Sequence, residues 1–170
     1  RICEILNSGN CSTATETVTV VAAPINAVSD TETDVNGLTG QADVLNVLSD
    51  DTLNAVDVDI ADITITVATG SSVPAGLTFD PATGNVSVDP NTPAGTYSFD
   101  YTICENLNTG NCSTATATVT VVPAQIEAMD DSASDINGAT GEADVLNVLS
   151  DDTLNTVDVD VADVTITVAT

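Results

Sequence analysis

The strongest constraint in the sequence is an internal repeat with a period of about 101 residues. The stretch ICEILNSGNCSTATETVTV occupies residues 2–20, and ICENLNTGNCSTATATVTV occupies residues 103–121. The same offset relates Gly40 to Gly141 and Thr69 to Thr170, with substitutions but no insertion or deletion. A fixed period of this length predicts tandem structural units, each the size of one domain. The 170 residues therefore cover about one and two-thirds units.

The charge of the chain excludes two classes of partner. It has 26 acidic residues against one basic residue, Arg1, and a net charge of −25. Nucleic acid and anionic membranes attract cationic surfaces, so we expect neither as a partner, whereas divalent cations become plausible ligands. The 42% of hydrophobic residues alternate with polar ones, which predicts a folded chain. No run of about 18 apolar residues is present, so no membrane-spanning helix and no direct membrane insertion are expected.

The hydrophobic pattern between residues 23 and 123 has period two, in short segments separated by turn residues. Such a pattern predicts about seven strands in an antiparallel β-sandwich, and no segment favours a helix. The predicted strands lie near residues 25–29, 43–51, 62–69, 77–80, 85–89, 95–103 and 113–122.

Alternation also predicts which side chains face the core. The inward residues are Ile63, Ile65, Val67, Tyr97, Phe99, Tyr101, Ile103, Ala115, Ala117, Val119 and Val121. The last strand then carries an outward row, Thr114, Thr116, Thr118 and Thr120. Such a row could meet ice or a glycan, but threonine is also a common residue on any exposed strand face.

The four cysteines form two copies of one pattern, with seven residues between Cys3 and Cys11 and between Cys104 and Cys112. A zinc site needs four ligands, and the chain has no His and only two Cys per repeat. The spacing predicts a local disulfide that closes a hairpin in each copy, with two free thiols as the alternative. Disulfides form in oxidising compartments, so we expect an exported protein. No signal peptide is visible, as expected for an internal fragment.

Two stretches carry a resemblance to a known family. SVPAGLTFDPATGNVSVDPNTPAGTYSFDYTICENLNTGNC resembles the second half, and EAMDDSASDINGATGEADVLNVLSDDTLN the opening half, of bacterial immunoglobulin-like or cadherin-like repeats. These repeats occur in giant surface adhesins of Bacteroidetes, including the flavobacterial gliding-motility type exported by the type 9 secretion system. The resemblance implies tandem Ig-like antiparallel β-sandwich repeats in a filamentous, multidomain adhesin at the cell surface. Tyr97 resembles the tyrosine corner of such folds.

The immunoglobulin plan implies a division of the chain into three parts. Residues 1–22 are expected to be the C-terminal hairpin of a preceding repeat, and residues 23–123 a complete repeat. Residues 124–170 are expected to be the N-terminal strands of the following repeat, with linkers at Pro24 and Pro123.

Acidic residues cluster in the loop SDDTLNAVDVDIAD and in its copy, and some related repeats bind calcium. Calcium takes six to eight oxygen ligands, which carboxylates and carbonyls can supply. A solvated acidic loop is the alternative, because the spacing lacks the order of an EF-hand, and Ser29 replaces the acidic residue found at Asp130 in the second copy. The candidate ligands are Asp30, Asp50, Asp51, Asp57 and Asp59, with Asp131, Asp151, Asp152, Asp158 and Asp160 in the second copy.

Catalysis has little support in the sequence. Without His or Lys the common acid-base and amine chemistries are missing, and no Ser lies in a GxSxG motif. The repeated acidic residues lie in loops without an aromatic platform for sugars, so we expect no enzymatic activity.

These observations predict a structural spacer in the stalk of a secreted adhesin, rigidified by calcium if the acidic loops bind it. Its expected partners are neighbouring repeats and other copies in a fibre. One alternative is a repeat that itself binds glycan, ice or a partner surface. The other is a subunit of a self-assembling extracellular filament.

Overall fold

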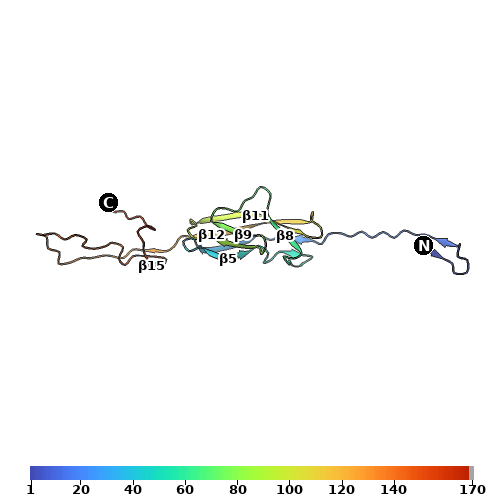
Figure 1. Cartoon of the computed structure of the whole chain (residues 1–170), viewed down its shortest axis with the longest axis horizontal. Helices are drawn as coiled ribbons and strands as arrows, with labels where there is room; N and C mark the ends of the chain where they lie inside the picture. Colours follow the sequence, from blue (N-terminus) through green and yellow to red (C-terminus); the bar gives the residue numbers. More distant parts are fainter. Residues whose placement is uncertain (169–170) are drawn as a thin grey trace.

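The computed structural model describes residues 1–168 and contains strands and turns without any helix in that range. Accordingly, those residues contain no helix long and apolar enough to cross a membrane. A central sandwich spans residues 25–122, with residues 1–22 leaving one end and residues 124–168 leaving the other (Figure 1). We call these flanking parts the N-terminal segment and the C-terminal segment.

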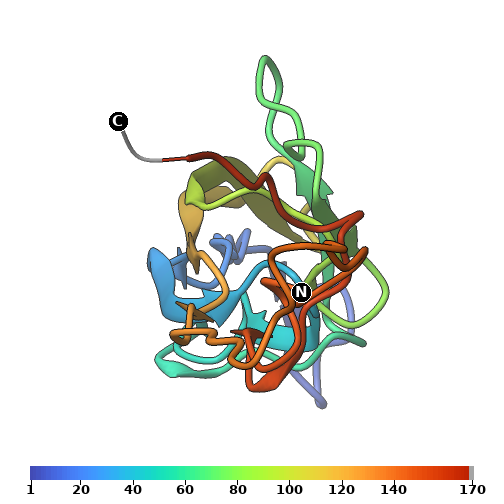
Figure 2. The ribbon, with the colours of Figure 1, turned by 90° about the vertical axis from the view of Figure 1, so that its left-hand side faces the viewer.

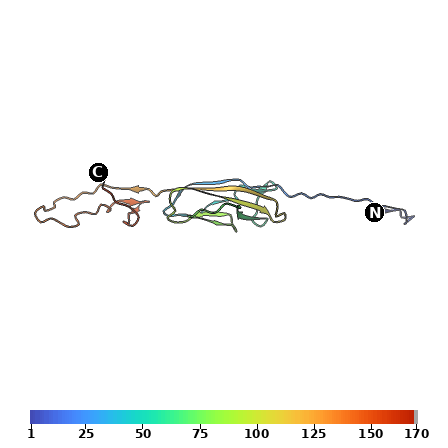
Figure 3. The ribbon, with the colours of Figure 1, turned by 90° about the horizontal axis from the view of Figure 1, so that it is seen from above.

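Two main sheets form the central sandwich. The four-stranded sheet has the order β4-β12-β11-β8, with β4 (Asp30–Asn36), β12 (Cys112–Val122), β11 (Gly95–Glu105) and β8 (Ile63–Val67). The three-stranded sheet has the order β5-β10-β9, with β5 (Gln41–Asn46), β10 (Asn85–Val88) and β9 (Leu77–Asp80). All pairs are antiparallel except β4 with β12, which is parallel. The long strands run nearly along the long axis of the molecule (Figure 3).

A small third sheet lies at the end of the sandwich nearest the N-terminal segment. It consists of β3 (Ile25–Asn26), β6 (Thr52–Leu53) and β7 (Val56–Asp57). Asn54 and Ala55, between β6 and β7, both have positive φ (55° and 60°), as a two-residue type I′ hairpin turn requires. The C-terminal segment repeats this sheet as β13 (Ile126–Glu127), β14 (Thr153–Leu154) and β15 (Val157–Asp158).

The core lies between the two main sheets and confirms the predicted alternation. Phe99, Tyr101 and Ile103 on β11 are at most 2% exposed, and Phe79 packs on Phe99 with ring centroids 5.2 Å apart. The other buried apolar residues are Val35, Val44, Val47, Ile63, Ile65, Leu77, Val86, Val88, Ala115, Ala117, Val119 and Val121. Tyr97 donates a hydrogen bond to the Pro93 carbonyl (2.7 Å), four residues upstream, as a tyrosine corner does. The loop between β8 and β9 stands away from this body in the view along the long axis (Figure 2).

The structure corrects the predicted strand list: the first strand ends at Asn26, β6 and β7 are additional short strands, and two larger differences involve β4 and β5. Residues 30–36 form β4, which the pattern did not predict because Val35 is the one apolar residue in DTETDVN. Pairing with β12, which is distant in sequence, holds this polar segment as a strand. The predicted strand at residues 43–51 instead ends at Asn46, whose side chain accepts a hydrogen bond from the Leu48 amide (2.9 Å) and begins a turn.

The flanking segments contain repeat sequence without the strands that bury it in the central sandwich. Residues 13–24 are extended and form no strand pairing within the described chain. Val18 and Val20 are 84% and 88% exposed, whereas Val119 and Val121, one repeat later, are 0% and 2% exposed. The same residues are therefore core or surface depending only on their neighbours.

Both predicted disulfides are present and join residues that face each other across a strand pair. Cys3–Cys11 links β1 (Ile2–Cys3) to β2 (Cys11–Ser12), and Cys104–Cys112 links β11 to β12. The Cα atoms are 4.1 Å apart in each bond. The second bond closes the end of the two longest strands in the sandwich.

Replacing Cys104 and Cys112 together by alanine should lower the free energy of unfolding of the central sandwich by ~2 to 3 kcal/mol, because the unfolded chain loses a short covalent loop. Urea unfolding of the full chain measures this. The matched control replaces Cys3 and Cys11, which lie outside the sandwich, and should leave its transition unchanged. Uptake of an alkylating agent at all four cysteines of the native chain would contradict the disulfide assignment.

Candidate functional site

A buried acidic cluster, formed by Asp30, Asp51 and Tyr101, lies within the central sandwich. Asp30 is the first residue of β4, Asp51 precedes β6, and Tyr101 lies in the middle of β11. The two carboxyl groups belong to residues that are 8% and 0% exposed, and Tyr101 is fully buried. The Tyr101 hydroxyl lies 3.1 Å from Asp30 Oδ2 and 3.2 Å from Asp51 Oδ1. One phenol therefore joins two buried carboxyl groups.

The cluster has more acceptors than protons. The Tyr101 hydroxyl carries one proton but has three acceptor groups around it, since the Val28 carbonyl lies at 2.7 Å. Two further donors reach the carboxylates: the Val28 amide donates to Asp51 Oδ1 (2.7 Å) and Ser49 Oγ donates to Asp30 Oδ1 (3.3 Å). No basic side chain is near, because Arg1, the one basic residue, lies beside Cys11 in the N-terminal segment. Two buried negative charges without a counter-charge are unfavourable, so the cluster favours an added proton or a cation.

Burial of the cluster without a counter-charge changes the pKa values of its three groups. Burial is the main cause that raises the pKa of Asp51 to about 6. Hydrogen bonds from Val28 and Tyr101 lower this pKa, whereas the nearby charges of Asp30 and Asp50 raise it further. Burial also raises the pKa of Asp30. Burial and the two carboxylates raise the pKa of the Tyr101 hydroxyl above its ordinary value, so the phenol stays a donor.

The C-terminal segment repeats the carboxyl part of the cluster. Asp152 is 8% exposed and accepts a hydrogen bond from the Met129 amide (2.8 Å), as Asp51 does from Val28. Asp131 Oδ1 accepts from Ser150 Oγ (3.2 Å), as Asp30 does from Ser49. The local chain therefore produces this arrangement without the tyrosine strand.

The other predicted ligands are not gathered into the cluster. Asp50 and Asp57 are exposed, and Asp59 Oδ1 accepts a hydrogen bond from the Ala61 amide (2.9 Å) within its own turn. In the C-terminal segment the side chains of Asp151 and Asp158 are likewise exposed. Asp160 Oδ1 accepts a hydrogen bond from the Ala162 amide (2.9 Å) within its own turn. Within residues 1–168 no three acidic or cysteine side chains are arranged to hold a metal ion.

Ser29 has a structural contact of its own. Its Oγ accepts a hydrogen bond from the Thr116 amide of β12 (3.2 Å). This residue therefore extends the pairing between β12 and the start of β4, and its hydroxyl is directed to the sheet.

A further buried carboxylate, Glu105, is 6% exposed and was not among the predicted site residues. Its two oxygens accept hydrogen bonds from the side-chain amides of Asn108 (2.8 Å) and Asn111 (2.7 Å) inside the disulfide loop. Asn111 also donates to the Ala23 carbonyl (2.6 Å). Glu4 makes the equivalent bonds to Asn7 and Asn10, so the repetition of these residues was a signal in the sequence.

Residues 36–122, just over half of the chain, match the protein-family model described as "Putative Ig domain". The chain belongs to this Ig-domain family. The matched range covers the strands from β5 to β12, including Tyr101, Glu105 and the Cys104–Cys112 disulfide. A search of curated proteins finds no significant match.

Several solved cadherin structures resemble this Ig-domain chain at low identity. Extracellular cadherin domains 1–4 of protocadherin gamma B7 are 16% identical with a TM-score of 0.44, covering 67% of this chain and 28% of that structure. The human desmocollin-1 ectodomain is 12% identical with a TM-score of 0.44, covering 68% and 24%. The third cadherin domain of human protocadherin 7 is 15% identical with a TM-score of 0.41, covering 66% and 95%. The chain thus spans about a quarter of the two larger structures, and the family assignment rests on the sequence match.

In calcium-free buffer, the Asp51 carboxyl should make the Ig domain less stable as the pH rises from about 4 to about 7. Below its ordinary pKa of 3.8, Asp51 is protonated in both the folded and unfolded states. Between that value and about 6 the unfolded chain loses the proton while the folded chain keeps it, so stability falls and the loss is complete above the folded pKa. The loss is on the order of 2 kcal/mol after allowance for solvent screening.

Urea unfolding at several pH values, with Asp51→Asn as the comparison, isolates this contribution. Asparagine is neutral throughout and can keep the bond from Val28, so the variant should have a flatter profile than the parent. Glu32→Gln, which removes a charge from β4 outside the cluster, should keep the parent slope. Parallel profiles for the parent and Asp51→Asn would show that Asp51 does not titrate as described.

Proposed function

We propose that the chain is a run of spacer repeats from the stalk of a secreted, filamentous cell-surface adhesin, with residues 23–123 as one complete repeat. The observation that carries the proposal is the end-to-end arrangement of repeat sequence along one axis (Figure 3). The N-terminal segment, the central sandwich and the C-terminal segment follow one another in chain order along that axis. A stalk needs this arrangement, because its length then grows with the number of repeats.

The link between successive repeats is short and tied down. Residues 123–125 connect β12 to β13 and include Pro123, which limits backbone freedom. The Gln125 carbonyl accepts a hydrogen bond from the Asn155 amide (2.7 Å), and the Asn155 side chain accepts one from Asn36 Nδ2 (2.8 Å). A short linker bonded to Asn155, which in turn is bonded to Asn36 of the central sandwich, favours a semi-rigid rod over a flexible chain.

Membership of the Ig-domain family and the two disulfides support an extracellular location. The net charge of −25 favours solubility and disfavours nucleic acid as a partner. The resemblance to adhesin repeats of flavobacterial gliding type supports the stalk role and a bacterial cell surface. On this proposal the chain is not an enzyme, and its partners are neighbouring repeats.

The threonine face offers weaker support for direct ligand binding. Thr102 and Thr114 hydroxyls bond to each other (2.9 Å), and the Thr116 hydroxyl donates to Asp100 (2.7 Å). These cross-strand bonds use groups that a glycan or ice surface would need. The spacer role therefore stands ahead of a repeat that binds glycan, ice or a partner surface.

Proteins of two, three and four in-phase repeats of residues 23–123 should show a maximum dimension that grows nearly linearly with repeat number. Each repeat should add roughly 35 to 45 Å, since its longest strands have 11 residues at about 3.4 Å each. Small-angle scattering measures the dimension. A variant with a Gly/Ser run at the linker should be shorter than the parent. A compact parent would contradict the rod, and growth of mass with concentration would favour a self-assembling filament.

We further propose that calcium rigidifies each repeat, with Asp30 and Asp51 supplying oxygen ligands and Asp50, whose side chain is exposed, turning toward them when the ion binds. Two of these carboxylates are buried and lack a basic partner, which suits a hard cation that prefers oxygen. The Asp50 charge is close enough to raise the pKa of both. Asp131, Asp151 and Asp152 are the matching residues of the following repeat. Asp57 and Asp59, with Asp158 and Asp160, lie in the same loops and remain candidates on the sequence alone.

A melt of one in-phase repeat in calcium should lie roughly 10 °C or more above a melt in EDTA at matched ionic strength. Extracellular sites bind calcium with Kd of ~10⁻⁴ to 10⁻³ M, and ligand at 100 times Kd adds ~2.7 kcal/mol of stability. Each kcal/mol moves the Tm of such a domain by roughly 4 to 8 °C. Asp51→Asn should lose most of the shift and Glu32→Gln should keep it. Superimposed parent curves would remove calcium from the proposal.

A further inference from the structure

An exposed leucine lies on a loop of the central sandwich that is closed by a disulfide and held by several hydrogen bonds. The disulfide loop, residues 105–111, is closed by Cys104–Cys112 and organised inside by Glu105. Asn106 ties it to the sandwich: its side chain donates to the Ala61 carbonyl (2.9 Å), and its amide donates to the Asp62 carbonyl (2.9 Å). Leu107, at the next position, is nevertheless 91% exposed. Leu6, one repeat earlier, is 90% exposed.

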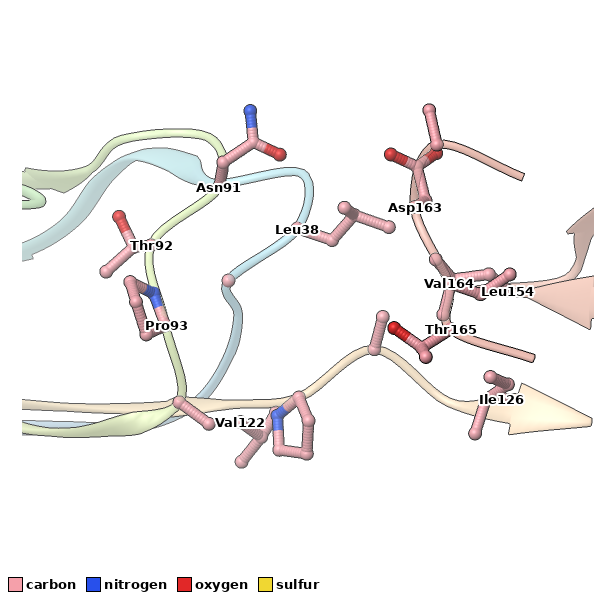
Figure 4. A pocket seen from close by; sticks show the side chains of 15 residues that line it. Leu38, Asn91, Thr92, Pro93, Val122, Ile126, Leu154, Asp163, Val164 and Thr165 are labelled. Atoms are coloured by element: carbon pink, nitrogen blue, oxygen red, sulfur yellow. The ribbon is translucent and has the colours of Figure 1, made fainter. Parts of the chain in front are cut away.

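A cavity of about 640 Å³ lies at the opposite end of the sandwich, where the next repeat begins (Figure 4). Leu38 points from the central sandwich toward Asp163 and Val164 of the C-terminal segment. The sandwich wall is uncharged, and among residues 1–168 Asp163 is the one charged residue that lines the cavity. We call this wall the C-terminal pole; it consists of Gly37, Leu38, Asn91, Thr92, Pro93, Ala94 and Val122.

The C-terminal pole is shaped by close packing of its backbone. A side chain at Gly37 would meet the Thr92 carbonyl oxygen, and the Thr92 amide donates to the Gly37 carbonyl (2.9 Å). Thr92 is 5% exposed, and its hydroxyl donates to the Asp89 carbonyl (2.6 Å). The backbone of the pole is therefore held in place by the packing of Gly37 against Thr92.

Comparing equivalent residues of the two repeats identifies the segment that would lie beside this cavity if the following domain were complete. In the central sandwich, Leu107 lines a smaller cavity together with Leu53, Ala61 and Asp62. One repeat later these three residues are Leu154, Ala162 and Asp163, and all three line the junction cavity. A disulfide loop placed on the C-terminal segment as residues 105–111 are placed on the central sandwich therefore reaches the rim of the junction cavity.

We propose that the leucine of the following repeat's disulfide loop packs across the junction against the C-terminal pole of the central sandwich, with Leu38 at the centre of the contact. A repeat with this much negative charge gains no attraction between its poles from charge, so apolar contact is the available source. The disulfide and the Glu105 bonds fix the loop beforehand, so little conformational entropy is lost. We call this contact between the disulfide loop of one repeat and the C-terminal pole of the preceding one the lock.

The inference rests on the proposed spacer function in one respect, since it requires consecutive repeats in one chain. The test uses the full 170-residue chain followed by a second copy of residues 70–123, which completes the second domain with its own disulfide loop. Leu107→Ser is made either in the added loop, which faces the C-terminal pole, or at the original Leu107, whose preceding pole is not part of this protein. The original position is thus a matched control.

Leu107→Ser in the added loop should lower the Tm of the extended chain by roughly 3 °C or more, since a buried leucine becomes polar. The same change at the original position should leave the Tm within about 1 °C. Leu38→Ala should remove most of the effect of the first substitution and none of the second, because only the added loop contacts Leu38.

Equal Tm shifts at the two positions, or shifts that add to that of Leu38→Ala, would overturn the lock. Small-angle scattering on the same protein separates this failure from failure of the spacer. An extended particle without Tm coupling would remove the lock and leave the stalk, whereas a compact particle would remove the stalk.

Discussion

The structure depends on the pairing of β12 with two partners at once. β12 pairs antiparallel with β11 along its whole length and parallel with β4 on its other side. Its inward residues, Ala115, Ala117, Val119 and Val121, are all at most 8% exposed. Residues 13–21 have nearly the same sequence but neither partner, and they remain extended and exposed. Strand propensity alone does not hold this segment in a sheet; backbone pairing with two neighbouring strands and burial of its alternate side chains in the core between the two sheets do.

The same strand pairing helps to bring the carboxyl groups of Asp30 and Asp51 together beside Tyr101. β4 begins at Asp30 because Ser29 and Asp30 lie where the pairing with β12 starts, and β11 places Tyr101 beside them. Asp51 reaches the same point through its bond to the Val28 amide. Asp30 and Tyr101 are positioned by strand pairing and Asp51 by its bond to Val28, so the carboxylates cannot move apart without breaking these contacts. A proton or a cation relieves the repulsion at lower cost than unfolding that edge.

The core could be predicted from the sequence because alternation is a local property. Phe99, Ile103 and Val119 follow from period two alone, and the disulfides follow from the repeated cysteine spacing. β4 could not be predicted, since its polar sequence becomes a strand only through a distant partner. Ten acidic residues were candidates for the site, and the structure gathers Asp30 and Asp51, with their copies Asp131 and Asp152. Local bonds to a backbone amide and to a serine select these residues, and in the central sandwich Tyr101, whose inward position implied a buried hydroxyl partner without identifying it, joins the two carboxyl groups.

A chain with 26 acidic residues can form a stalk only if its repeats meet through surfaces that carry little charge. The structure meets this condition on one side of the junction, because the acidic residues lie outside the C-terminal pole. Acidic residues gather in the loop of residues 50–62 and inside the sandwich, whereas the C-terminal pole consists of small, apolar and amide residues. The contact observed across the junction is a hydrogen bond between two neutral amides, Asn36 and Asn155. An uncharged C-terminal pole lets the acidic end of the following repeat approach without like-charge repulsion, while the acidic sides of the repeats repel other copies, which favours a single extended rod over lateral bundles.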